Sequence, residues 1–163
     1  MFTKKQIGTI IKVLKDKCIE ERPALRQVFE QGGFLWATNG YVAFELAEVK
    51  DEFKDKAITL EKLQAWNATH KASETTTLIE LANDNEYSAP AMTTLLHQEY
   101  KEAKDFKFNI DFLKLATDFL GVKLFTVEVS ATNSNCFRIK PLETMHVAHE
   151  AMEIKAYVMG LGR

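Results

Sequence analysis

Apolar positions recur at helical spacing near the start of the chain. Residues 3–18 are predicted to form an amphipathic helix for which Thr3 can serve as the N-cap. Its apolar stripe comprises Ile7, Ile10, Ile11 and Leu14, with Val13 at the margin. The opposite face carries Lys4, Lys5, Lys12 and Lys15. The pattern therefore predicts a helix with one buried side and one basic side.

Between residues 22 and 46 the pattern changes to short apolar runs separated by turn signals. One turn is expected at the glycine pair 32–33 and the other at Asn39-Gly40. Asn-Gly is the strongest short hairpin signal, because both residues tolerate the positive φ that a type I′ turn demands. We therefore predict a three-stranded meander whose second turn presents residues 38–41 at its tip.

Two more helices and several strands follow along the chain. The second helix is predicted over residues 60–71, with Trp66 on its core side, and the third over residues 108–121. Asn109 can cap the start of the third helix, and Gly121 stands where a terminating glycine belongs. Its buried stripe is expected to comprise Ile110, Leu113, Ala116 or Thr117, and Leu120, widened by Phe112 and Phe119. Strands are expected at 57–59, 75–81, 124–129, 136–139 and 154–161, a turn at 83–85, and a loop or short helix at 97–107.

The composition describes a globular chain of 163 residues, 46% hydrophobic and 27% charged, large enough for one domain or two small ones. A net charge of -2 lacks the basic excess typical of nucleic-acid binders, although segregated lysines can still bind DNA. Cys18 and Cys136 lie far apart without metal-ligand spacing, so we expect free thiols in a reducing cytoplasm. Neither an export signal nor an apolar run long enough to span a membrane is recognised.

The meander also carries a family resemblance. From Arg22 onward, the sequence Arg-Pro-x-Leu, a hydrophobic pair, a glycine turn and Ala-Thr-Asn-Gly resembles the middle domain of the bacterial sliding clamp, the processivity subunit of the replicative polymerase. That family usually carries Ala-Thr-Asp-Gly, followed by a basic or His residue and a Leu. Here Asn39 replaces the acid, and Tyr41-Val42-Ala43 follow the glycine. The resemblance implies an α+β fold of βαβββ units, with antiparallel sheets that carry helices on one face.

The resemblance also implies binding sites. In the sliding-clamp family, partner proteins insert a short peptide bearing Leu and Phe into an apolar pocket between the hairpin tip and the C-terminal strand. Carried over to this chain, the pocket comprises Thr38, Gly40, Tyr41, Val42, Leu95, Tyr157, Val158, Met159 and Leu161. Val158 and Leu161 could equally be ordinary core residues of a terminal strand.

Helices of the family hold duplex DNA through phosphate contacts without reading its sequence. The resemblance therefore assigns DNA binding to Lys4, Lys5, Lys12 and Lys15. The alternative for these lysines is a solvated surface with no ligand.

Enzymatic chemistry has weaker support. His146 and His149, with Glu143 and Glu150, are the one cluster with metal-like spacing, but H-x-x-H-E is not the H-E-x-x-H arrangement of helical zinc sites. The glycine pair 32–33 leads into a strand and not a helix, so it does not form a phosphate loop, and no G-x-S-x-G sequence is present. We expect a protein that is not an enzyme, with no metal and no cofactor.

The resemblance divides the chain into residues 1–100, similar to the clamp middle domain, and 101–163, similar to the end of the clamp C-terminal domain, unless all form one compact domain. The expected function is a sliding-clamp-like DNA replication processivity factor of the short kind that a phage or mobile element would carry. It would encircle or contact duplex DNA, dock polymerase-type or other clamp-binding peptides and form homo-oligomers. The alternative is a clamp-fold protein-interaction module or replication modulator that forms no ring.

Overall fold

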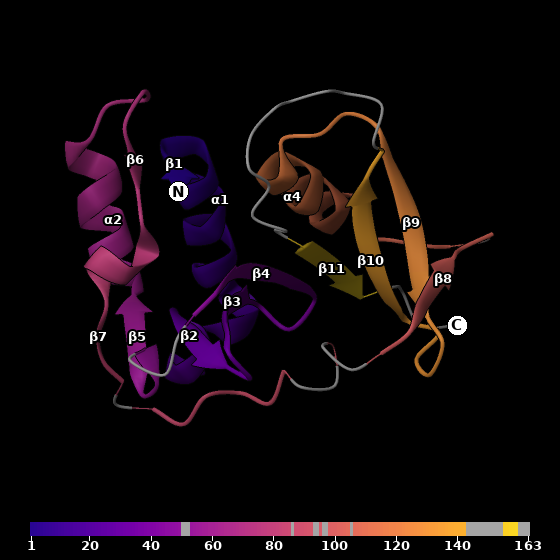
Figure 1. Cartoon of the computed structure of the whole chain (residues 1–163), viewed down its shortest axis with the longest axis horizontal. Coiled ribbons are helices and arrows are strands. Elements are labelled where there is room, and N and C mark those ends of the chain that lie inside the picture. Colours follow the sequence, from indigo (N-terminus) through magenta and orange to yellow (C-terminus); the bar gives the residue numbers. More distant parts are fainter. Residues whose placement is uncertain are drawn as a thin grey trace.

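The computed structural model describes residues 1–49, 53–85, 87–92, 95, 98–104, 106–142 and 155–159. Within them, one antiparallel sheet of nine strands runs in the order β7-β5-β2-β3-β4-β11-β10-β9-β8, and β1 and β6 form a separate ribbon (Figure 1). The helices are α1 (Lys4–Leu14), α2 (Leu60–Thr69) and α4 (Ile110–Leu120). The strands are β1 (Phe2–Thr3), β2 (Gln27–Gln31), β3 (Phe34–Thr38), β4 (Val42–Glu48), β5 (Lys56–Thr59), β6 (Thr75–Thr76), β7 (Asn83–Asp84), β8 (Tyr100–Glu102), β9 (Phe125–Ser130), β10 (Cys136–Pro141) and β11 (Lys155–Met159). The α+β class is thus confirmed.

Strand β11 connects the strands of the first half of the chain with those of the second half, because it lies between β4 and β10 in the sheet. β11 pairs with β4, so that Tyr157 lies opposite Ala43 and Val158 opposite Val42. A strand, a helix and three further strands follow one another twice along the chain, first as β1-α1-β2-β3-β4 and again as β8-α4-β9-β10-β11. These two units meet where β4 pairs with β11. The boundary expected between residues 100 and 101 falls within β8, after its first residue.

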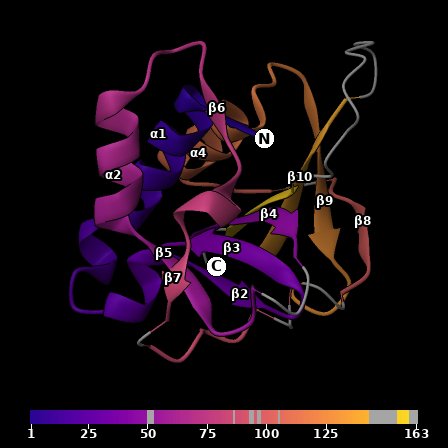
Figure 2. The same cartoon turned by 60° about the vertical axis from the view of Figure 1, so that its left-hand side comes forward.

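The three helices cover one face of the sheet, where α1 contacts both α2 and α4 (Figures 1 and 2). The main core lies between these layers and includes fully buried Ile7, Ile10, Val28 and Ile58. Phe44 of β4 and Phe119 of α4 stack within this core with their ring centroids 4.1 Å apart. None of the helices in the described ranges is both long and apolar enough to cross a membrane.

Local signals set the helix ends. Thr3 and Gln6 form a capping box at the start of α1, as expected of Thr3. Asn109 caps α4, and Gly121 ends it with a positive φ of 69°. The first helix is shorter than predicted, because it stops at Leu14 and a 3₁₀ turn follows at Lys17–Ile19.

Two apolar stripes are rotated from their predicted positions. In α1, Val13 is fully buried and Ile11 is only half-buried, although Val13 was placed at the margin. In α4, Ile110 is 71% exposed, whereas Ala116 and Phe119 are completely buried. The insertion of the Phe119 ring against the sheet sets the orientation of α4, and spacing along the helix does not determine this contact.

Three local predictions, of a strand, a turn and a loop or short helix, were wrong in detail. Of the strand expected at 75–81 only Thr75–Thr76 exists, and Leu78–Leu81 form a 3₁₀ turn. The turn expected at 83–85 contains Asn83–Asp84, which pair with β5 as an edge strand. The region 97–107 contains β8, which pairs with β9. Strands this short are stabilised by their neighbours in the sheet, so their own sequence carries little signal.

Candidate functional site

The tip of the β3–β4 hairpin is held by the side chain of Asn39. Its Oδ1 atom accepts the backbone N–H groups of Tyr41 at 3.0 Å and Val42 at 2.8 Å. Gly40 has a positive φ of 88°, but Asn39 does not, so the predicted type I′ turn is wrong. The turn is instead an Asx turn, in which the side-chain carbonyl of Asn39 satisfies the backbone donors.

Asn39 also anchors the tip to the end of the first helix. Its side chain is buried, and Nδ2 donates to Asp16 Oδ2 at 2.8 Å. Burial acts to raise the pKa of Asp16, but hydrogen bonds from Cys18 and Asn39 outweigh it and lower that pKa below its usual value. An amide therefore suits position 39, where the resembling family usually has Asp, because a second carboxylate would face Asp16.

A groove lies beside this tip on the face of the sheet opposite the helices. The backbone N–H of Met159 donates to the Tyr41 carbonyl at 2.7 Å, which fixes the end of β11 to the hairpin tip. The groove has a volume of about 560 Å³ and is lined mainly by apolar side chains. The lining residues are Leu25, Thr38, Gly40, Tyr41, Val42, Ala43, Pro90, Ala91, Met92, Leu95, Gln98, Thr132, Asn133, Tyr157 and Met159.

The structure brings most of the predicted pocket residues together at this groove. Those that line it are Thr38, Gly40, Tyr41, Val42, Leu95, Tyr157 and Met159. Val158 does not, because it alternates with its neighbours along β11 and is buried in the core on the helix side. Leu161 lies outside the described residues.

Several groove residues were missed by the sequence analysis. Met92 lies in the segment that contributes Leu95, and its side chain is buried against Tyr157 and the rest of a second, smaller core cluster. Thr132 and Asn133 come from the β9–β10 turn. The proximity of Met92 to Leu95 in sequence was a usable signal, but no local pattern connects the β9–β10 turn with the hairpin.

The aromatic ring of Tyr41 forms one edge of the groove. Tyr41 is 49% exposed and stacks on Phe112 of α4, with centroids 5.2 Å apart and planes 9° from parallel. The stack holds the Tyr41 ring in place without burying it. Large, rigid and partly exposed aromatic rings of this kind are common at protein-binding sites.

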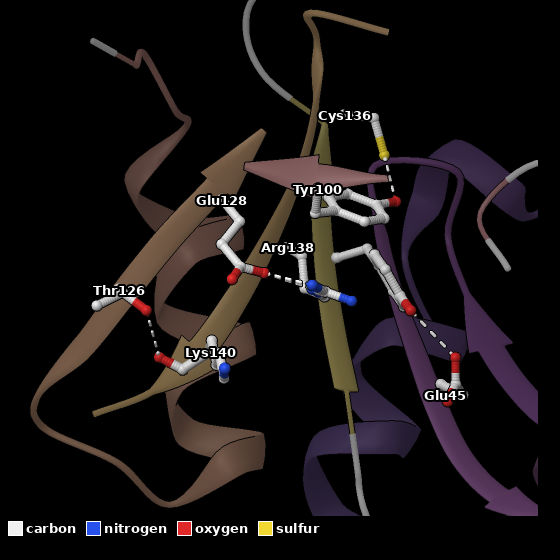
Figure 3. A network of polar contacts seen from close by, with 8 residues as sticks. Glu45, Tyr100, Thr126, Glu128, Cys136, Arg138 and Lys140 are labelled. Carbon is white, nitrogen blue, oxygen red and sulfur yellow. Dashed lines mark hydrogen bonds and ion pairs between the residues drawn. The ribbon is translucent and has the colours of Figure 1, made fainter. Parts of the chain in front are cut away.

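A polar network stiffens the wall of the groove (Figure 3). Tyr157 donates its hydroxyl to Oε2 of buried Glu45 at 3.1 Å, and Lys155 pairs with Oε1 of the same carboxylate at 3.0 Å. Burial, followed by the nearby Glu45 charge, raises the pKa of Tyr157 well above its usual value. The Tyr157 ring also lies near Tyr100, with centroids 5.8 Å apart, and the Arg138 guanidinium sits 4.5 Å from the Tyr100 centroid. The apolar face of Tyr157 is thereby presented to the groove in a fixed orientation.

The four predicted DNA-binding lysines all lie on or at the end of α1, but they are not equivalent. Lys5, Lys12 and Lys15 are exposed. Lys4 is half-buried, and its Nζ donates to the His70 carbonyl at 2.6 Å, which ties α1 to the end of α2. The exposed basic side of α1 therefore consists of three of the four predicted lysines.

No metal site is found among the other candidate residues that the structure describes. Cys18 and Cys136 are free thiols, the first exposed and the second buried. His146, His149, Glu143 and Glu150 lie outside the described residues. In the part of the chain that the structure describes, no three His, Cys, Asp or Glu side chains are grouped closely enough to hold a metal ion.

Searches of protein-family models, of curated proteins and of solved structures found no match for this chain. The class of this protein must therefore be inferred from the geometry of the site, which is a preformed apolar groove beside a rigid hairpin tip.

Proposed function

We propose that this protein is a sliding-clamp-like processivity factor that docks apolar peptide segments of polymerase-type partners. The observation that supports the proposal is the groove. Seven of the nine residues expected from the family resemblance come from distant parts of the chain and line one cavity, namely Thr38, Gly40, Tyr41, Val42, Leu95, Tyr157 and Met159. The repeated order of strand, helix and three strands is a second, weaker support.

The chemistry of the groove suits a short peptide with large apolar side chains. Met92 and Met159 supply flexible, polarizable walls that adapt to different side chains, and Leu95 adds a branched apolar surface. The volume of about 560 Å³ falls within the range of ordinary ligand pockets. A Leu and a Phe side chain, packed with their backbone extended across the groove, would cover this apolar surface.

Peptide binding is tested by fluorescence anisotropy with a labelled ten-residue peptide that carries Leu-Phe at its centre. Met159→Ala and Leu95→Ala should each weaken binding about tenfold, because each removes apolar contact area from the groove. Leu124→Ala is the matched control, because Leu124 is 63% exposed and does not line the groove. If the peptide does not bind, or if both groove variants bind as tightly as the control, the docking function is wrong.

DNA contact is the second part of the proposal and rests on the exposed lysines of α1. Such contacts are electrostatic, so the affinity should fall steeply with salt. A variant carrying Lys5→Gln, Lys12→Gln and Lys15→Gln should weaken binding to a labelled duplex and reduce the salt slope by about 0.9 per lost phosphate contact. Lys4 is kept in this variant, because it bonds to the His70 carbonyl and its loss would disturb the helix packing. Unchanged DNA affinity in the triple variant would refute the basic-face hypothesis.

The alternative function, a clamp-fold interaction module without a ring, is favoured by the sheet edges. The edge strands β7 and β8 contain two and three residues. Edges this short offer few backbone groups for pairing with another copy. Light scattering after size exclusion separates the two functions, because a ring needs a discrete closed oligomer whereas the module remains a monomer over a concentration series.

A further inference from the structure

Gln98 is a polar residue of the groove whose side chain is incompletely paired. The Gln98 Oε1 atom is buried and has no hydrogen-bond partner within the described residues. One other buried side-chain oxygen there has none, Asn67 Oδ1, and Asn67 lies on α2 and not among the groove residues. Buried carbonyl oxygens are almost always paired in native proteins, so an unpaired one at a candidate binding site requires an explanation.

Neighbouring polar groups of the groove do have partners within the protein. The hydroxyl groups of Thr38 and Tyr157 each donate a hydrogen bond to an internal acceptor. The side-chain carbonyl of Asn133 accepts the backbone N–H of Asn135. Among these groove residues, Gln98 therefore carries an acceptor that has no partner in the described protein. Because Oε1 is buried in the free protein, the side-chain amide has to turn toward the groove before a ligand can reach it.

We propose that Gln98 determines peptide specificity: when the segment docks, the side-chain amide of Gln98 turns toward the groove and its Oε1 accepts a hydrogen bond from one backbone N–H of the peptide. This inference rests on the proposed docking function. A backbone donor fits best, because the Leu and Phe side chains suited to an apolar groove carry no donors. An extended peptide, in contrast, keeps a free N–H at every residue except proline. The hydrogen bond fixes where the peptide backbone lies, whereas the apolar walls fill with side chains.

A requirement follows for the sequence of the partner. The residue whose N–H meets Gln98 cannot be proline, because proline has no backbone donor. A peptide that lacks this N–H leaves the Gln98 oxygen buried and unpaired in the complex, and such a loss corresponds to roughly 5- to 150-fold in affinity.

The test combines protein variants with a scan of the peptide. The labelled Leu-Phe peptide is made as a series in which each backbone N–H is replaced in turn by N-methyl, and each member is titrated against the wild type and Gln98→Met. Methionine has nearly the same length and shape as glutamine but no strong acceptor. Gln98→Glu keeps an acceptor and lacks the N–H, and Gln64→Met on α2 is the matched control outside the groove.

We expect one N-methylated peptide to bind the wild type, Gln98→Glu and Gln64→Met about tenfold more weakly than the unmodified peptide does, with no such loss in Gln98→Met. The free Gln98→Met protein should unfold at a temperature no lower than the wild type, because it loses an unpaired polar atom. If the unmodified peptide binds but each N-methyl group weakens the affinity equally in the wild type and in Gln98→Met, Gln98 does not form a hydrogen bond with the peptide backbone. If the unmodified peptide fails to bind the wild type, the docking function itself is wrong, and the inference about Gln98 with it.

Discussion

The hydrogen bond between Asn39 and Asp16 predicts a large penalty for replacing one amide by a carboxylate. Asn39→Asp keeps the size of the side chain and the acceptor that caps Tyr41 and Val42, but it removes the donor 2.8 Å from Asp16 Oδ2. Losing a hydrogen bond to a charged acceptor costs about 1.5–3 kcal/mol. Two carboxylates about 4 Å apart add up to about 4 kcal/mol of repulsion at an effective dielectric constant of 20.

The net loss should be smaller than that sum, because Asp16 is only half-buried and can turn toward solvent. We expect the free energy of unfolding to fall by about 3 kcal/mol at pH 7, a value within the range of single substitutions that break a buried polar contact. For a chain of this length each kcal/mol lowers the midpoint of thermal unfolding by about 2–4 °C. The predicted shift is therefore roughly 6–12 °C.

The penalty should also depend on pH. In the folded Asn39→Asp variant the two carboxylates share one site, which raises the pKa of the pair above that of a free carboxyl group. The folded variant then binds more protons than its unfolded chain, so the deficit is largest at neutral pH and shrinks as the pH falls toward 5. In the wild type the pKa of Asp16 is lowered, so its contribution to stability is present at neutral pH and is lost as the pH falls through the folded-state pKa.

Thermal unfolding followed by circular dichroism, with urea titration for the free energy, measures both effects. The control is the double variant Asp16→Asn/Asn39→Asp, in which the amide and the carboxylate exchange places and the hydrogen bond can form again. It should recover most of the lost stability. An Asn39→Asp variant as stable as the wild type at pH 7, or a double variant no better than Asn39→Asp, would refute the role given to this contact.

Three further predictions follow from single contacts. Gly8→Ala should raise the free energy of unfolding by about 0.5–1 kcal/mol, because a side chain there meets open space in α1; a loss of stability in urea titration would contradict the described packing. Tyr157→Phe should cost about 1–3 kcal/mol in the same titration by leaving the buried Glu45 carboxylate without its hydroxyl donor, and no change would show that this bond is dispensable. Although Cys18 is exposed as a residue, its Sγ is partly desolvated against the Asn39 carbonyl, and this desolvation and the Asp16 carboxylate raise the pKa of the thiol to about 11. At pH 8 its reaction with an aromatic disulfide reagent should therefore be slow and should become faster in Asp16→Asn; equal rates would exclude an influence of Asp16.

Structural features that depend on residues close together in the chain were predicted well from the sequence. The capping box of Thr3 and Gln6, the N-cap Asn109 and the terminating Gly121 are local hydrogen-bonding signals, and all lie where they set the helix ends. The Asn39-Gly40 hairpin is likewise present. Its turn type was wrong, because the contact with Asp16 favours an Asx turn and no local pattern reveals that contact.

Features that depend on distant partners were not predictable from periodicity. Residues 83–84 and 100–102 become strands only because β5 and β9 offer edges to pair with. The orientation of α4 is set by the contact between Phe119 and Phe44. Predicted groove residues came from the family resemblance and not from pattern, and Gln98 was missed because an unpaired buried atom can be recognised only in a folded structure.

The most direct test of the docking function is methyl NMR of the methionine side chains during titration with the Leu-Phe peptide. Met92 and Met159 line the groove, whereas Met1 is exposed beside β6 and serves as an internal control. If the groove is the docking site, the ε-methyl signals of Met92 and Met159 will shift and saturate together, and that of Met1 will stay in place. If the peptide leaves the Met92 and Met159 signals unmoved, or shifts all three signals alike, the groove is not a peptide-docking site.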